Sequence, residues 1–259
     1  MTAQPVLELE QRDRVAIVAL NRPEKRNALN LPLVDALREF FASPPDGIGA
    51  VVLHGAGEHF CAGLDLAERL ASPKKAAVDG MRHSQRWHRS FERIQFGDVP
   101  VVSVLKGAVI GGGLELAAST HVRVAERSAF FQLPEAQRGV FVGGGGSVRI
   151  ARIIGVGRMI EMMLTARRYD ADDGLRLGLA HYVVEPGAGL ERAIELATQI
   201  ASNAPISNFA IINAIARIND MSISDGLFTE SVVAALSRTS GEAEERIASF
   251  LKKAKPRSP

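Results

Sequence analysis

Three consecutive glycines at residues 111–113 mark the junction that most constrains how this chain can fold. An apolar run rich in valine precedes them at residues 99–105 and predicts a buried strand. Good helix-forming residues follow at 114–119, so the glycines stand between a strand and the start of a helix. Glycine lets the backbone approach another molecule closely, and a helix start presents free N–H groups and the positive end of its dipole. The junction is therefore a candidate anion site.

Two carboxylates accompany this junction. Glu115 falls in the first turn of the predicted helix, and Glu135 follows twenty residues later (135 − 115). A second bare-backbone turn comes at residues 143–146, which are all glycine. Two carboxylates beside an anion site are the groups that an enzyme uses to move protons around an enolate. Taken singly, Glu115 is also explained as a helix N-terminal charge, Glu135 as a surface residue, and the glycines as a packing turn.

Several other chemistries lack their motifs in this chain. No GxSxG nucleophile turn, HExxH zinc motif or GxxxxGK phosphate loop occurs. The glycine pairs at 55 and 57 and at 155 and 157 lack the third glycine of a dinucleotide-binding fingerprint. Cys61 is the single cysteine, which excludes an internal disulfide and a metal site built from several cysteines.

The composition is that of an ordinary globular chain. Its 259 residues are 46% hydrophobic and 23% charged, so the chain can bury a sizeable core. A net charge of +2 argues against nucleic acid as the main partner. The first residues show no secretory pattern, and no apolar run reaches membrane-spanning length without a charge. We therefore expect a cytoplasmic protein with no membrane partner.

Apolar periodicity predicts a strand-rich body followed by helices. Strands are expected over residues 6–10, 15–20, 50–54, 99–105, 122–125, 130–133 and 181–185. Helices are expected over residues 30–41, 74–96, 147–154 and 158–166, then after Asp170, and later from Pro205, Ser222 and residues 239–242. The strand–glycine–helix unit at 99–119 recurs at 50–66, which favours a spiral of ββα units with a C-terminal helical region.

Four segments carry a resemblance to one family. Residues 105–118 resemble the signature of the crotonase (enoyl-CoA hydratase/isomerase) family, and the likeness extends to residues 21–29, 59–66 and 131–140. The segments keep the family's order and approximate spacing over roughly residues 5–200, so together they are far more specific than a lone glycine pattern. The resemblance implies an α/β fold of the crotonase/ClpP-like type. It divides the chain into a spiral core with the active site over residues 1–200 and a helical oligomerisation region over 201–259.

The resemblance also implies roles for individual residues. In the family two backbone N–H groups form an oxyanion hole, and they correspond here to those of Leu64 and Gly112. Glu115 then activates a water molecule, and protonated Glu135 delivers a proton to the substrate. The substrate-binding positions implied by the same segments are Lys25, Arg26, Ala28, Ala62, Gly63, Asp65, Gly111 and Gly143.

Both glutamate positions are occupied, which in this family is typical of hydratases, whereas many other branches keep only one. We therefore predict an enoyl-CoA hydratase that adds water across the 2,3 double bond of a 2-enoyl-CoA thioester. Coenzyme A is then part of the substrate, and no metal or redox cofactor is implied. The alternatives are a double-bond isomerase, an aromatic acyl-CoA hydratase-lyase and, from another class, a crotonase-fold binding protein with residual catalysis.

The roles of three side chains of the predicted 74–96 helix have two interpretations. His83, Trp87 and His88 either cover the pocket or belong to an ordinary helix surface. A fourth residue, His121, stands where the family commonly has aspartate, which puts a structural hydrogen bond in question.

The C-terminal region predicts assembly. Apolar residues recur there at helical spacing. The strand-rich body of the same chain need not bury all of them, so another subunit can cover them. Family members commonly form trimers, often paired into hexamers, through this region. The resemblance thus predicts a homotrimer or homohexamer that buries two apolar stripes. One is formed by Ile206, Phe209, Ile212 and Ile215, and the other by Phe228, Val232 and Ala235.

Overall fold

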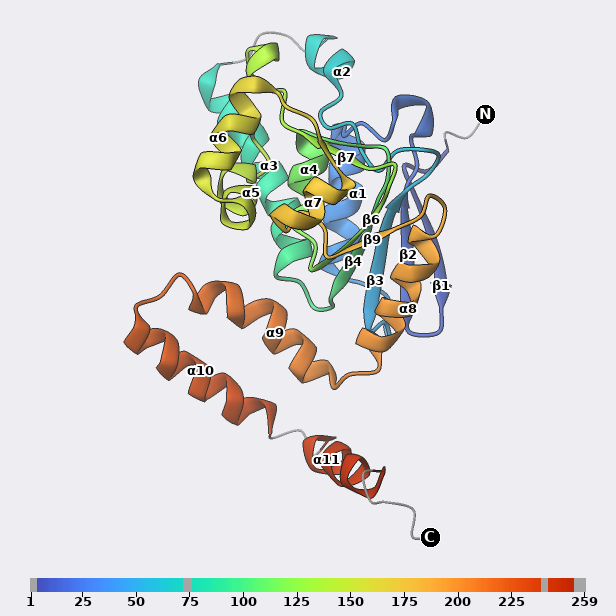
Figure 1. The fold of residues 1–259 in the computed structure, drawn as a ribbon, viewed down its shortest axis with the longest axis vertical. Helices are drawn as coiled ribbons and strands as arrows, with labels where there is room; N and C mark the ends of the chain where they lie inside the picture. The colour runs from blue at the N-terminus through green and yellow to red at the C-terminus, as the bar shows by residue number, and fades with distance from the viewer. Residues whose placement is uncertain (1–3, 72–75, 239–241, 254–259) are drawn as a thin grey trace.

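The computed structural model describes residues 4–71, 76–238 and 242–253. Within these ranges the main sheet has six strands in the order β1-β2-β3-β4-β6-β9, antiparallel at the β1 edge and parallel thereafter (Figure 1). Every residue of β2 and β4 is buried, as is usual for parallel strands covered on both faces. The strands are β1 (Leu7–Arg12), β2 (Val15–Leu20), β3 (Ala50–Gly55), β4 (Val101–Leu105), β6 (Val122–Glu126) and β9 (Tyr182–Val184).

A smaller sheet forms the second layer of the spiral. It pairs β5 (Ala108–Ile110) in parallel with β7 (Phe130–Gln132), and β7 antiparallel with β8 (Tyr169–Asp170). Isolated bridges of Leu29 with Leu64 and of Cys61 with Val109 extend this layer to earlier turns. Successive turns of the chain thus add a strand to the main sheet and an extended segment to the second layer. The predicted α/β spiral of ββα units is confirmed.

The glycine-rich junction is more structured than its sequence predicts. β5 lies inside it, and α4 (Gly112–Ala117) begins within the glycine triplet rather than after it. Gly111 has a φ of 53°, a backbone conformation that favours glycine, so the chain turns directly from β5 into α4. This turn places the Gly112 N–H and Glu115 together at the start of a short helix.

Helices cover both faces of the main sheet (Figure 1). On one face α8 (Gly189–Ala201) packs its buried Ala193 and Ala197 against the strands. The larger core lies on the opposite face, where Leu37 and Phe91 are fully buried. The other helices of this body are α1 (Leu31–Ala42), α2 (Leu66–Ala71), α3 (Ala77–Gln95), α5 (Gly146–Ile154), α6 (Val156–Thr165) and α7 (Ala171–Leu177).

Polar side chains cap several helices at the predicted positions. Asn30 accepts a hydrogen bond from the Leu33 N–H at 3.1 Å and starts α1, and Asp170 caps α7 in the same way. One break is shorter than predicted, because α6 resumes directly after Gly155 rather than beyond residue 157. The start predicted over residues 239–242 falls mostly on residues 239–241, which lie outside the described residues.

His121 makes the structural bonds that its position requires. Its Nδ1 accepts a hydrogen bond from the Val101 N–H at 2.9 Å, and its Nε2 donates to the Gln95 carbonyl at 3.0 Å. Burial lowers the pKa of His121 to about 4, so the ring is neutral at ordinary pH. A neutral imidazole therefore joins the start of β4 to the end of α3 where the family commonly has aspartate.

The last helices extend away from the body (Figure 1). α9 (Pro205–Ile218) and α10 (Ile223–Ser237) pack side by side, and α11 (Glu242–Lys253) follows them. Asn213 ties α9 to the body by donating to the Gly97 carbonyl at 3.0 Å. No helix in the described ranges combines the length and the apolar character needed to cross a membrane.

Candidate active site

A cavity of about 230 Å³ opens where the glycine-rich junction meets α3 and the 143–146 loop. Both predicted catalytic carboxylates, Glu115 and Glu135, line it together with Leu64 and Gly112. Residues from three separate stretches of sequence therefore meet in one site. Among the predicted substrate-binding residues, the same cavity is lined by Ala62, Gly63, Gly111 and Gly143.

Glu115 is held by the backbone of the glycine loop. Its side chain is 3% exposed, and its Oε1 accepts hydrogen bonds from the N–H groups of Gly144 and Gly146, each at 2.8 Å. A Cβ at residue 146 would lie 2.9 Å from this oxygen, so the close approach requires glycine. Burial raises the pKa of Glu115, while the N–H groups of the loop act in the opposite direction. The loop thus supports a charged carboxylate inside the protein.

Glu135 has the opposite surroundings. It is 7% exposed, and its Oε2 is buried without a hydrogen-bond partner among the described residues. Burial, reinforced by the nearby charge of Glu115, raises the pKa of Glu135 to about 7. A carboxyl group with this pKa carries a proton in about half of the molecules at neutral pH, so Glu135 can serve as a proton donor.

Backbone geometry brings two N–H groups to the same wall of the cavity. The bridge that joins Leu29 to the Leu64 segment uses the Gly63 carbonyl at 2.7 Å and the Asp65 N–H at 2.9 Å, so the Leu64 N–H points to the other side. The Gly112 N–H lies at a helix start, which offers it no intrahelical acceptor. Within the described part of the chain neither group donates to an acceptor. The pair is suited to bind one oxygen atom.

Gly63 allows these two segments to touch. It has a φ of +87°, and a Cβ there would lie 2.6 Å from the Ile110 carbonyl oxygen and 3.1 Å from the Gly112 nitrogen. The close approach of these two segments therefore depends on the glycine at position 63, whose own N–H donates to Cys61 Sγ at 3.4 Å.

One face of α3 closes the cavity. His83, Ser84 and Trp87 line it, at the spacing that places residues on one side of a helix. Trp87 packs so closely on the start of α4 that a Cβ on Gly112 would lie 2.7 Å from its ring. His83 and Trp87 therefore do cover the pocket, whereas His88 lines a different cavity.

A second cavity of about 270 Å³ adjoins the first between α1, α2 and α3. The two cavities share Leu64, Arg69, Gly80, His83 and Trp87. Together they can hold an elongated molecule, with one part beside the two glutamates and the remainder between α2 and α3.

The remaining predicted substrate-binding residues have other surroundings. Lys25 and Arg26 are exposed and Ala28 is buried, and none of the three lines either of these cavities. Asp65 lines the second cavity, but its carboxylate already bonds to Arg22 at 2.9 Å and to the N–H groups at the start of α2. Its side chain is therefore engaged by the protein itself.

The motifs do not predict several residues of the cavity wall. Ser84 could have been inferred from its helical spacing to Trp87. The others belong to α2 or follow Glu135, and the family-like segments assigned them no role. These wall residues are Leu66, Arg69, Arg138, Val140 and Phe141. The described residues contain no group of three or more His, Cys, Asp or Glu placed to hold a metal ion.

Comparison with known proteins identifies the family of the chain. The family described as enoyl-CoA hydratase/isomerase matches residues 10–257 of the chain. The chain belongs to this family. A short-chain-enoyl-CoA hydratase of Clostridium acetobutylicum is 33% identical over 253 residues, which cover 95% of each protein. The crotonase resemblance inferred from the motifs is confirmed.

Solved structures give the same result for the fold. An enoyl-CoA hydratase from Bacillus anthracis superimposes with a TM-score of 0.89 at 31% identity, covering 96% of both chains. A Rhodopseudomonas palustris protein assigned to the same enzyme class superimposes with a TM-score of 0.92 at 48% identity, covering 98% of this chain and 97% of that one.

Proposed function

We propose that this protein is an enoyl-CoA hydratase, which adds water across the 2,3 double bond of a 2-enoyl-CoA thioester. The main support is that Glu115 and Glu135 line one cavity with Leu64 and Gly112, whose N–H groups have no other acceptor among the described residues. A base, an acid and a pair of fixed donors are the parts that this addition needs.

In this mechanism the Leu64 and Gly112 N–H groups bind the thioester oxygen. Negative charge builds on that oxygen as water adds to Cβ, because the electrons of the double bond move toward the carbonyl. Fixed donors therefore stabilise the transition state more than the bound substrate and lower the barrier.

The two glutamates move the protons. Ionised Glu115 takes a proton from water as the water oxygen bonds to Cβ, and protonated Glu135 gives its proton to Cα. The loop N–H groups at Gly144 and Gly146 support the charged form of Glu115, and the pKa of about 7 supports a protonated Glu135. Proton exchange with water returns both groups to their starting states. Coenzyme A is part of the substrate, and none of these steps uses a metal or a redox cofactor.

The names of relatives support the acyl-CoA substrate class. Besides the short-chain-enoyl-CoA hydratase, a 2,3-dehydroadipyl-CoA hydratase of Escherichia coli is 31% identical over 252 residues, covering 96% of this chain. These two enzymes are named for different acyl groups, and the proposal accordingly names the class of 2-enoyl-CoA thioesters.

The test is an ultraviolet assay with crotonyl-CoA, because hydration destroys the conjugated chromophore. We expect the absorbance to fall and mass spectrometry to show a product heavier by one water. A 3-enoyl-CoA that gains absorbance without a change of mass would instead identify an isomerase. No change with either substrate, although acyl-CoA binds, would indicate a binding protein.

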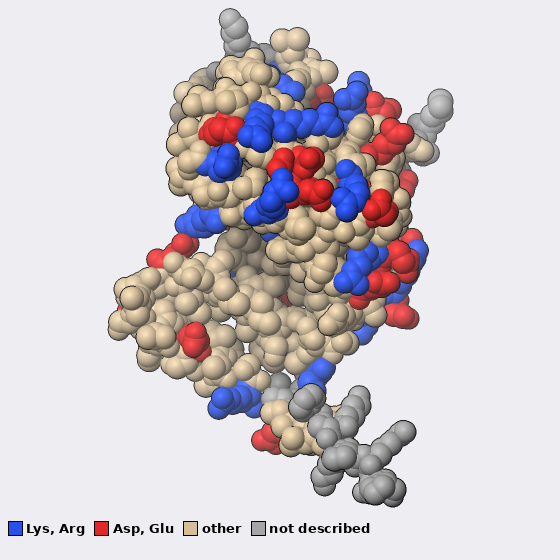
Figure 2. Space-filling view, viewed as in Figure 1, with Lys and Arg blue, Asp and Glu red and all other residues tan. Residues whose placement is uncertain are grey.

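The proposal includes assembly into a homotrimer or homohexamer through residues 201–259. The α9–α10 hairpin shows few charged side chains in Figure 2 and keeps large apolar ones exposed. Phe209 is 43% exposed and Phe228 is 71% exposed, which favours burial of these side chains against another subunit in an oligomer. Light scattering on the intact chain tests this, and a monomer with full activity would contradict it.

A further inference from the structure

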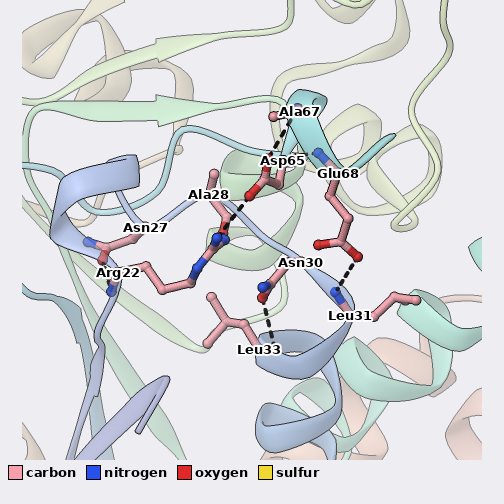
Figure 3. A network of polar contacts seen from close by, with 9 residues as sticks. All are labelled: Arg22, Asn27, Ala28, Asn30, Leu31, Leu33, Asp65, Ala67 and Glu68. Atoms are coloured by element: carbon pink, nitrogen blue, oxygen red, sulfur yellow. Dashed lines mark hydrogen bonds and ion pairs between the residues drawn. The ribbon is translucent and has the colours of Figure 1, made fainter. Parts of the chain in front are cut away.

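A largely buried ion pair joins Arg22 to Asp65, the residue that follows Leu64 in the chain (Figure 3). Arg22 Nη2 is 2.9 Å from Asp65 Oδ2, and the two side chains are 15% and 9% exposed. Arg22 also donates through Nη1 to the Ala28 carbonyl. Because Ala28 precedes Leu29 and Asp65 follows Leu64, one guanidinium ties together the two segments of the bridge.

Both ends of this pair are themselves anchored. Asp65 Oδ1 accepts hydrogen bonds from the N–H groups of Ala67 and Glu68 at 3.2 Å each, which starts α2. Burial opposes ionisation of Asp65, but the bond from Arg22 and these N–H groups outweigh it and lower the pKa of the carboxyl. On the other side, the fully buried Asn27 accepts from the Arg22 N–H at 2.9 Å. The pair is therefore a fixed charged link rather than a mobile surface contact.

The Arg22–Asp65 ion pair acts on the Leu64 N–H through the bridge between Leu29 and Leu64. The direction of the Leu64 N–H depends on the hydrogen bonds on either side of it, from Leu29 N–H to the Gly63 carbonyl and from Asp65 N–H to the Leu29 carbonyl. A change in the register of Asp65 against residues 28 and 29 would rotate that N–H. Hydrogen-bond strength falls steeply as the angle and distance depart from their optimum.

We propose that Arg22 and Asp65 are positioning residues, which hold the Leu64 N–H in place for the thioester oxygen. The inference rests on the hydratase function proposed above. It differs from the expectation that Asp65 contacts the substrate, and also from a role in stability alone.

The test uses Asp65→Asn and Arg22→Lys, with Asp35→Asn as the matched control. Asp35→Asn also breaks an arginine–aspartate pair between two elements, because Asp35 bonds to Arg86 of α3 at 2.7 Å, but neither residue lines the two cavities. Loss of a whole oxyanion donor costs on the order of 10²- to 10³-fold in kcat, so misplacement of one should cost roughly tenfold or more. We expect that loss in kcat for Asp65→Asn, with KM for crotonyl-CoA little changed and the control close to wild type.

A spectroscopic readout separates positioning from stability. Butyryl-CoA labelled with ¹³C at the thioester carbonyl can bind but cannot be hydrated, and its infrared carbonyl band reports the strength of the hydrogen bonds to that oxygen. We expect the band to move to lower frequency on binding to wild type and to the control, and to move less in Asp65→Asn. Arg22→Lys keeps one charge but cannot reach both acceptors in the fork geometry of arginine, so its band should fall in between.

Three results would overturn the inference. One is a folded Asp65→Asn or Arg22→Lys protein with wild-type kcat and an unchanged carbonyl shift. Another is a raised KM with unchanged kcat, which would mean that Asp65 contacts the substrate. A third is an equal loss in the Asp35→Asn control. If Asp65→Asn does not fold, Arg22→Lys decides alone. A wild-type protein that binds butyryl-CoA but hydrates no enoyl-CoA would remove the hydratase proposal, while the carbonyl shift would still test the positioning.

Discussion

Glu115 and Glu135 share one cavity, yet the segments around them treat a carboxyl group in opposite ways. The 143–146 loop supplies Glu115 with two backbone donors at 2.8 Å, whereas the buried Oε2 of Glu135 receives none from the described residues. Donors favour the charged form of a carboxyl group, and burial without donors favours the neutral form. Burial raises the pKa of both carboxyl groups, and the loop donors oppose that rise at Glu115, so the backbone geometry favours Glu115 as the base and Glu135 as the acid.

Removing either carboxyl group should give the largest effect. Glu115→Gln still accepts both loop N–H groups, so the fold should hold, but it cannot take a proton. Glu135→Gln cannot deliver one. Each should lower kcat for crotonyl-CoA hydration about 10²-fold or more. The double variant should lose far less than the product of the two, since both act on one step. A single variant with a near wild-type rate would show that its residue has no role in proton transfer.

The pH dependence should sharpen the comparison. Glu135 must be protonated to act as the acid, so kcat/KM should fall as the pH rises through about 7, approaching tenfold per pH unit. Glu115 must be ionised, so an acid limb should appear above the ordinary glutamate range. If the alkaline limb is absent in wild type, the assignment of Glu135 as the acid is wrong.

The same raised pKa should appear in the stability of the fold. Glu135 binds its proton more tightly in the folded state, with a pKa of about 7 against an ordinary 4.5. The stabilisation is complete below the unfolded value and is lost as the pH rises through about 7. Glu135→Gln should therefore exceed wild type in unfolding free energy above pH 7, by about 3 kcal/mol, and match it in acid. Urea unfolding across this range measures the difference.

Crowding the glycine loop should give the smallest loss. In Gly146→Ala the new Cβ would lie 2.9 Å from Glu115 Cγ and Oε1, so the carboxylate must shift. We expect kcat to fall roughly tenfold with KM nearly unchanged, as for a displaced catalytic group. Gly157→Ala is the control, because a Cβ there meets no atom within 4 Å. Equal activity in both variants would mean that the loop does not position Glu115.

Much of the body could be predicted from local patterns. The continuous apolar runs at 15–20 and 50–53 are buried strands that pair in parallel, and the capping residues Asn30 and Asp170 start helices at the predicted positions. Such features depend on side-chain periodicity and on bonds within a few residues, which a sequence displays directly. The membership in the family also followed from motifs that are contiguous in the chain.

The sequence by itself thus determined which stretches form the buried strands, the helix starts at Asn30 and Asp170, and the presence of two carboxylates near a glycine-rich helix start. Only the tertiary structure decided what surrounds each of them. It engaged Asp65 with Arg22, 43 residues away, and left Lys25 and Arg26 outside the two cavities. It also gave the donors of the 143–146 loop to Glu115 and none of them to Glu135. These outcomes depend on which distant segments come within hydrogen-bond distance, and a carboxyl group takes its pKa from those neighbours rather than from its own position in the chain.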